Sequence, residues 1–188
     1  MSGYSAMKET LQQEYKERSP QYRDRLASWH GEPSVVRVER PTNLPRAREL
    51  GYKAKEGIIV IRVRIRSGKR KRKAFDGGRK PSKTGRFFSR TPSLQSIAEG
   101  RAAIKFSNYE VLNSYLVGNN GYEKFYEVIA LDRNSGALLA DPVYSSVIAQ
   151  KRRALRGLTA SGRRHRGLEA SGFGTYKSRP SKRASTRS

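Results

Sequence analysis

The sequence contains no cysteine, which excludes disulfide bonds and zinc sites built on thiolates. It contains no uninterrupted apolar run longer than four residues, which excludes a transmembrane helix and argues against a signal peptide. Glu9, Glu14 and Glu17 near the N-terminus argue against a transit peptide, because such peptides are poor in acidic residues. These absences lead us to expect a soluble, cytoplasmic protein.

Sequence motifs of catalysis are also missing. There is no G-x-S-x-G, no P-loop and no G-x-G-x-x-G, since Gly172-Phe173-Gly174 lacks the third glycine. The acidic residues are scattered, so no pair stands in an apolar setting suited to acid–base chemistry or to Mg²⁺. His30 and His165 are the only histidines and lack partners for a metal site. We therefore expect a protein that is not an enzyme and that binds no metal or cofactor.

Acidic residues are few compared with basic ones. The 188 residues include 40 lysines and arginines but only 16 acids, and the formal net charge is +24. Self-repulsion of this size disfavours a compact isolated chain and attracts nucleic acid or an anionic membrane. The length is sufficient for one domain with a hydrophobic core.

The charge is distributed in blocks. Residues 1–33 hold five acids and five bases, and residues 107–142 hold five acids and two bases. By contrast, residues 62–90 hold thirteen bases and one acid, and residues 151–188 hold twelve bases and one acid. This pattern predicts a folded body, over residues 1–156, with a basic internal loop at about 67–90. A basic extension would follow over residues 157–188.

Residues 57–66 alternate aliphatic and basic side chains, which predicts a β-strand with two unlike faces. One face carries Ile59, Ile61, Val63 and Ile65, and the other carries Arg62, Arg64 and Arg66. The aliphatic face requires a core, and the arginine face requires anions because like charges on one strand face repel. Five bases follow at 69–73. The alternative is a solvated strand beside a flexible basic loop.

The remaining pattern predicts an α+β fold, with a mainly antiparallel sheet, packed helices and long basic extensions. Helices are expected over 5–18, from Pro20 to Gly31, for one turn over 46–50, from Thr91-Pro92 to about 106, and over 143–155. Strands are expected over 34–40, 57–66, 109–117 and 122–131, with a short edge strand over 137–140. Tyr22 and Trp29 are expected in the core, whereas Tyr52 is a candidate for stacking on a nucleobase. From residue 158 onward the chain has little to bury.

Several stretches together resemble one known family. They are Leu50 to Lys55 with the following GIIVIRVRIRSGKRKR, Ser93 to Glu99, Leu112 to Tyr115, Tyr126 to Ile129, and Arg156 to Arg163. In this order they resemble large-subunit ribosomal protein fifteen of the archaeal and eukaryotic type. The resemblance implies a structural protein with an α+β body whose partners are 23S-type rRNA and neighbouring large-subunit proteins. Its extensions would be embedded in RNA. The tail after Gly172 departs from the longer, histidine-rich eukaryotic form, which favours the archaeal type.

Two separate basic extensions and an arginine-faced strand favour contacts with phosphates, because arginine grips phosphate with paired donors and glycine lets the backbone approach. The candidate rRNA-binding residues are Lys53, Lys55, Arg62, Arg64, Arg66, Lys69, Arg70, Lys71, Arg72, Lys73, Arg79, Lys80, Lys83, Arg86, Arg152, Arg153, Arg156, Arg163, Arg164, His165 and Arg166. A chromatin-like protein that compacts DNA is the main alternative function. An RNA-modifying enzyme with basic arms is a third, although no cofactor loop is visible.

Overall fold

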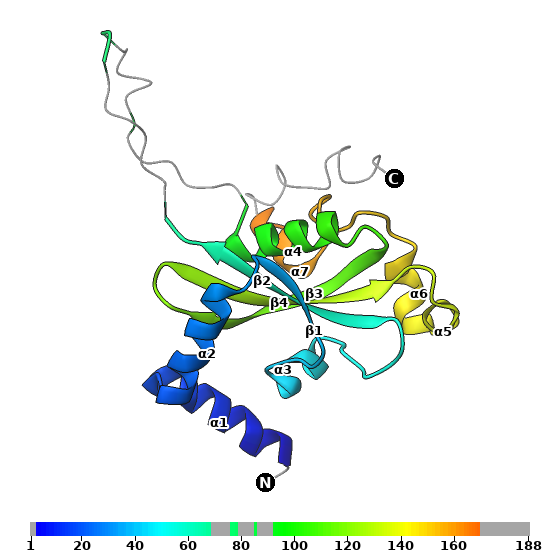
Figure 1. Ribbon diagram of the computed structural model, residues 1–188. Helices are drawn as coiled ribbons and strands as arrows, with labels where there is room; N and C mark the ends of the chain where they lie inside the picture. Colours follow the sequence, from blue (N-terminus) through cyan, green and yellow to red (C-terminus); the bar gives the residue numbers. More distant parts are fainter. Residues whose placement is uncertain (1–2, 69–75, 79–84, 86–91, 170–188) are drawn as a thin grey trace.

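A computed structural model describes residues 3–68, 76–78, 85 and 92–169 (Figure 1). The helices in these ranges are α1 (Gly3–Glu17), α2 (Pro20–Gly31), α3 (Leu44–Glu49), α4 (Leu94–Lys105), α5 (Gly136–Leu139), α6 (Pro142–Ile148) and α7 (Ala160–His165). The strands are β1 (Val35–Val38), β2 (Ile58–Arg66), β3 (Tyr109–Asn119) and β4 (Glu123–Asp132). All pairings are antiparallel in the order β1-β2-β4-β3, which confirms the predicted α+β class. Most of the predicted internal loop and the chain after residue 169 lie outside the described residues.

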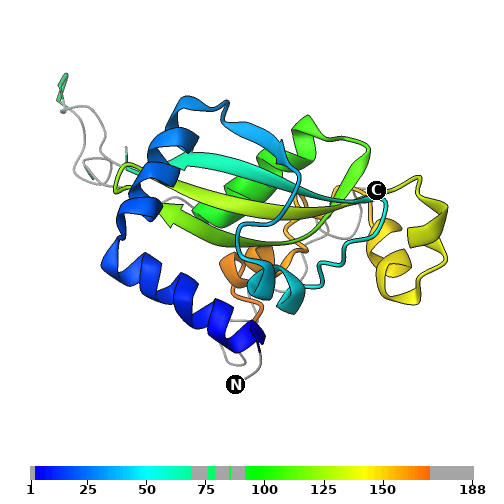
Figure 2. The ribbon, with the colours of Figure 1, turned by 60° about the horizontal axis from the view of Figure 1, so that its bottom comes forward.

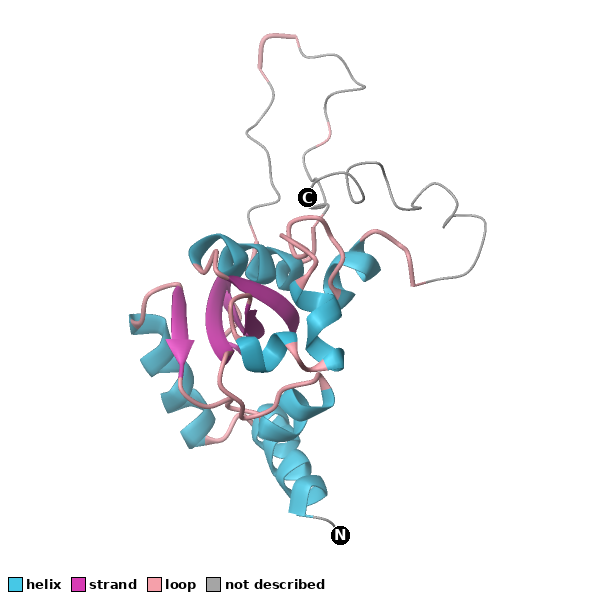
Figure 3. Ribbon diagram, turned by 90° about the vertical axis from the view of Figure 1, so that its right-hand side faces the viewer, coloured by secondary structure: helices cyan, strands magenta, loops and turns pink. Residues whose placement is uncertain are grey.

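The sheet is covered on both faces. Helices α4 and α7 lie on one face, and α2 and α3 lie on the other (Figure 1), and Figure 3 shows helices on both sides of the sheet. The predicted aliphatic face of β2 packs under Ala98 and Ala102 of α4. On the opposite face, Tyr22, Leu26 and Trp29 of α2 pack against Phe125 of β4, as their helical spacing predicted. Figure 2 shows α1, α2 and α3 together on this second face.

The helix starts follow from capping chemistry. Ser19 caps α2 by accepting from the Tyr22 amide, and Pro20 follows at the first helical position, as predicted. The prediction that Thr91-Pro92 starts the next helix is wrong, because Ser93 caps α4 instead. No helix within the described ranges is long and apolar enough to cross a bilayer.

The β3–β4 hairpin forms at the predicted Gly-Asn-Asn-Gly sequence, with Gly121 at φ +92°. The two asparagines contribute through their side chains and not through a left-handed backbone. Asn119 Oδ1 accepts from the Gly121 amide, and Asn120 Oδ1 accepts from the Glu123 amide. Asparagine suits this turn because its carboxamide oxygen satisfies nearby backbone donors.

The edge strand predicted over 137–140 is wrong, because this segment is the short helix α5. Its side chain Leu138 is fully buried against Leu131 of β4 and Tyr144 of α6. A run of four apolar residues does not distinguish a strand from a helical turn, and packing decides between them here.

The helix predicted over 143–155 ends at Ile148 as α6. The buried Glu110 carboxylate of β3 accepts hydrogen bonds from the backbone amides of Arg152 and Arg153, at 2.8 and 3.0 Å. Arg152 adopts the left-handed conformation, with φ +55°. Glu110 thus takes over amides that a continued helix would bond internally, and the chain turns instead.

Candidate nucleic-acid interface

The arginine face of β2 is partly neutralised by the protein itself. Arg62 Nη2 bonds both carboxylate oxygens of Glu32, at 2.6 and 2.8 Å, and its guanidinium lies 4.4 Å from the centre of the Trp29 ring. Only 11% of the Arg62 side chain is exposed. Arg62 is therefore held by an acid and an aromatic ring inside the fold.

A second acid, Glu123 at the start of β4, lies near the last two arginines of the arginine face of β2. It lies 3.5 Å from Arg64 Nη1 and 3.6 Å from Arg66 Nε, and His30 Nδ1 donates to it at 2.7 Å. Burial raises the pKa of Glu123, but the His30 hydrogen bond and the nearby Arg64 outweigh it and leave the pKa below its ordinary value. Arg66 remains 81% exposed.

Acids of the protein itself therefore supply part of the negative charge that the arginine face of β2 was predicted to require. The antiparallel register pairs Arg66 with Glu123 and Arg62 with Glu127. Glu123 and Glu127 are four residues apart and so share one face of β4. This spacing was a signal in the sequence that the charges of β2 had partners in the next strand.

Glu127 is fully buried and ties the sheet to the β1–α3 connection. It accepts from the backbone amide and hydroxyl of Thr42 and from the hydroxyl of Tyr115. Burial raises the pKa of Glu127, and it also raises that of Tyr115. Glu127 is a structural linker, because it joins β4 to Tyr115 of β3 and to Thr42 of the β1–α3 connection.

Arg153 is also occupied internally. Its Nη1 donates to the carbonyls of Val111 and Leu112, at 2.7 and 2.9 Å, while Glu110 binds its backbone amide. Burial lowers the pKa of the Arg153 guanidinium. In the same turn Arg156 Nη1 donates to the Lys151 carbonyl, and the Arg152 side chain is exposed.

Helix α7 is anchored by Glu99 of α4, which is fully buried. Glu99 accepts from the hydroxyls of Thr159 and Ser161 and, on its other oxygen, from Ser114 of β3. The prediction that the chain has little to bury after residue 158 is wrong for this segment, because Thr159, Ser161 and Gly162 are buried. In the sequence, Glu99 lies next to Ala98 and close to Ala102 on the predicted helix. Its place among these apolar positions was the one sign that Glu99 could be buried.

The anchored helix presents basic side chains to solvent. Arg163 and Arg164 are exposed, and Arg164 Nε meets Glu169 at 2.9 Å. Arg166 folds back so that its Nη1 donates to the Gly157 carbonyl at 3.2 Å. His165 is half-buried. The four predicted residues of this group thus divide into two that face outward and two that pack locally.

Lys53 and Lys55 lie on the connection between α3 and β2, and both are exposed. Lys55 Nζ is 3.0 Å from Asp141, and Lys53 Nζ lies 5.7 Å from the centre of the Tyr144 ring. Tyr52 is half-buried and packs against the core residues Ala47 and Tyr115. The other predicted residues lie outside the described part of the chain: Lys69, Arg70, Lys71, Arg72, Lys73, Arg79, Lys80, Lys83 and Arg86.

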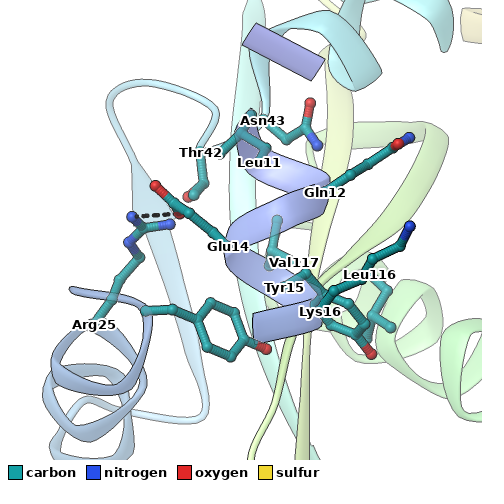
Figure 4. Close-up of a pocket in the computed structure, with 11 residues that line it drawn as sticks. Leu11, Gln12, Glu14, Tyr15, Lys16, Arg25, Thr42, Asn43, Leu116 and Val117 are labelled. Atoms are coloured by element: carbon teal, nitrogen blue, oxygen red, sulfur yellow. Dashed lines mark hydrogen bonds and ion pairs between the residues drawn. The ribbon is translucent and has the colours of Figure 1, made fainter. Parts of the chain in front are cut away.

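The α2 face of the sheet contains hollows, two of which border α2. One lies under α1, measures about 300 Å³, and is lined by Leu11 and Tyr15 of α1 and by Val117 of β3 (Figure 4). At its edge Arg25 is paired with Glu14 at 3.2 Å. The other measures about 490 Å³ and lies between α2 and the β3–β4 hairpin. Within the described ranges, no three His, Asp or Glu side chains are grouped to hold a metal ion.

Comparison with known proteins gives consistent matches over this chain. The model of the family described as Ribosomal L15 matches residues 2–185. A protein of Methanocorpusculum labreanum is 51% identical over 160 residues, which cover 84% of this chain and 82% of the relative. A protein of Picrophilus torridus is 45% identical, covering 100% of this chain and 98% of the relative. One of Methanocella arvoryzae is 46% identical, covering 87% and 85%. All three are named "Large ribosomal subunit protein eL15".

Proposed function

Because the chain belongs to the Ribosomal L15 family, we propose that it is a structural constituent of the large ribosomal subunit that binds and stabilises folded 23S-type rRNA. Its place is then the ribosome in the cytoplasm, beside other large-subunit proteins. The role is structural rather than catalytic. The archaeal type fits the archaeal relatives, which are 45–51% identical to the chain.

One observation carries the electrostatic part of this proposal. Four carboxylates are buried in the fold, where described donors of the protein bind them: Glu99, Glu110, Glu123 and Glu127. Burying acids leaves the surface more basic than the composition alone indicates. Positive side chains on a rigid body can neutralise phosphates and let RNA helices pack closely.

Among the described residues we assign the outer contacts to Arg66, Arg163 and Arg164, whose side chains are exposed on fixed backbones. Lys53, Lys55 and Arg152 are further exposed candidates. We assign a structural role to the Arg62 and Arg153 side chains, since both guanidinium groups donate hydrogen bonds to other groups of the protein. The bases at 69–73 and in the rest of the internal loop stay proposed contacts on sequence grounds.

Cosedimentation tests the proposal directly. The full chain, added to large subunits depleted of their own copy, is expected to sediment with them in low salt and to be retained in moderately high salt. Competition between rRNA fragments and duplex DNA at one salt concentration separates this function from DNA compaction. Equal competition by both would favour a chromatin-like protein, and failure to sediment with the subunit would overturn the proposal.

A further inference from the structure

We propose that the hollow between α2 and the β3–β4 hairpin binds one unpaired nucleotide of RNA, with the base inside and its phosphate at the rim. This inference rests on the proposed function and deepens it, because it assigns a site for a single nucleotide. The hollow measures about 490 Å³, which is within the range of small-molecule sites. Figure 1 shows α2 beside this hairpin.

The walls of the hollow are apolar and belong to rigid elements. Leu26 and Tyr22 are core residues of α2, and Ala27 adds a small side chain that leaves the space open. The Tyr22 hydroxyl accepts from the Asn119 amide at 3.0 Å and so fixes the hairpin against the helix. A flat apolar base gains most from a preformed apolar slot of this kind.

The rim of the hollow is positive. Arg18 and Arg23 both line it, and neither has an acidic partner within the described part of the chain. His30 lines it as well, with Nδ1 directed to Glu123. The hollow under α1 differs, because its arginine is already paired with a glutamate (Figure 4). The α1 hollow is lined by one acid, Glu14, and two bases, Lys16 and Arg25, whereas no acid lines the α2 hollow, so charge complementarity favours a phosphate at the α2 site.

The hairpin supplies donors suited to a base edge. The carboxamide oxygens of Asn119 and Asn120 are used by backbone amides of the turn. Their Nδ2 groups have no hydrogen-bond partner among the described residues, and both asparagines line the hollow. Amide donors of this kind recognise carbonyl oxygens and ring nitrogens of an unstacked base.

Backbone strain at the rim is consistent with this role. Arg18 connects α1 to α2 with φ +53°, a conformation that non-glycine residues rarely adopt and that costs about 1 kcal/mol. Glycine would relieve this strain. An arginine held there keeps a guanidinium at the mouth of the hollow, which a relaxed glycine would not provide.

A pair of matched variants tests the site. Ala27→Leu fills the hollow without changing charge, and Ser28→Leu adds the same side chain at the next exposed position of α2, outside the lining. Binding of random-sequence RNA hexamers and of a 12-base-pair RNA duplex is measured for both. We expect Ala27→Leu to weaken hexamer binding about tenfold and duplex binding less than twofold, because one base–protein contact of this kind contributes about 1–3 kcal/mol. Ser28→Leu should leave both within twofold.

A thiol-protection measurement covers the case in which Ala27→Leu does not fold. The natural chain has no cysteine, so Ala27→Cys supplies a unique thiol. Saturating hexamer should slow its alkylation by iodoacetamide at least tenfold, and saturating duplex should not. The proposed site would be overturned if Ala27→Leu and Ser28→Leu bound the hexamers equally well, or if Ala27→Leu weakened hexamer and duplex binding equally. It would also be overturned if saturating hexamer did not slow alkylation of the Ala27→Cys thiol. Wild-type protein that binds neither RNA would instead contradict the proposed function.

Discussion

At the scale of single residues, buried glutamates have a larger structural role than the basic composition suggests. Glu99, Glu110, Glu123 and Glu127 each accept hydrogen bonds from elements distant in sequence. A buried carboxylate is tolerable only when donors replace its lost hydration. In a chain with 16 acids, assigning four to the interior reduces the negative charge left for the surface.

Removing Glu99 tests this role most simply. We expect Glu99→Ala to lower the free energy of unfolding by about 3 kcal/mol, because three hydroxyls lose their charged acceptor and a cavity forms. Urea denaturation measures the change. Glu9→Ala, an exposed site on α1, is the control and should stay within about 0.5 kcal/mol of wild type. If Glu99→Ala lowered the free energy of unfolding as little as Glu9→Ala, the proposed role of Glu99 in anchoring α7 would be contradicted.

The two glutamates of β4 should respond to pH in opposite directions. Burial raises the pKa of Glu127, so its contribution to stability is greatest at acid pH and is lost as pH rises through the folded-state pKa. The pKa of Glu123 is lowered despite its burial, so its contribution is present above the ordinary value of 4.5 and is lost as pH falls through the folded-state pKa.

Urea denaturation of Glu127→Gln and Glu123→Gln between pH 3 and 7 measures this difference. As pH falls, the stability of wild type relative to Glu127→Gln should increase. Relative to Glu123→Gln it should decrease below about pH 4.5. Parallel pH profiles for the two variants would show that the two environments are not distinct.

At the scale of elements, sequence patterns correctly predicted those features of helices and strands that depend on neighbouring residues in the chain. The alternation in β2, the Ser19-Pro20 cap and the hairpin turn all formed as expected, since each depends on neighbours in the chain. The start of α4 was missed for a local reason, because Ser93 caps the helix in place of Thr91, but two other errors have long-range causes. Glu110 reaches from β3 to end the helix predicted through residue 155, and Glu99 reaches from α4 to fix α7. Such contacts join residues about 40 to 60 positions apart, so periodicity could not reveal them.

The same distinction applies to the candidate interface. The sequence identified Arg163 and Arg164 as candidate phosphate contacts, and both side chains are exposed on α7. The sequence did not reveal that Arg62 is paired with Glu32, because the pairing depends on the turn after α2 lying against β2. The hollow beside α2 was also invisible, since it is formed by two elements about 90 residues apart.

Close packing of α7 on the preceding turn gives a test at this scale. A Cβ at Gly162 would lie 2.7 Å from the Gly157 Cα, whereas a Cβ at Gly136 would meet nothing within 4 Å. We expect Gly162→Ala to lower the free energy of unfolding by about 2 kcal/mol, as overpacking does, and to speed amide exchange at Arg163 and Arg166.

Gly136→Ala is the matched control, because it is also a helical glycine. It should fall within about 1 kcal/mol of wild type, with unchanged exchange in α7. Denaturant titration and hydrogen exchange measured on both proteins check the pair. Rapid exchange throughout α7 in wild type would mean that the helix is not packed in the free protein.

At the scale of the whole molecule, a net charge of +24 is compatible with a compact body because the charge is organised. Acids are drawn into the fold, some arginines are paired internally, and other bases remain exposed. The chain thus contains a folded body held together by its own contacts and a set of exposed bases, which we propose bind RNA. Only the contacts that the exposed bases make with RNA should weaken strongly as the salt concentration rises.

The salt dependence of binding tests this central claim most directly. Affinity of the full chain for large-subunit rRNA should be measured across a range of monovalent salt concentrations. If eight bases contact phosphates, log affinity should fall against log salt with a slope of roughly −6 to −7, because each neutralised phosphate releases counterions. A slope near −1 would contradict distributed phosphate binding and the account with it.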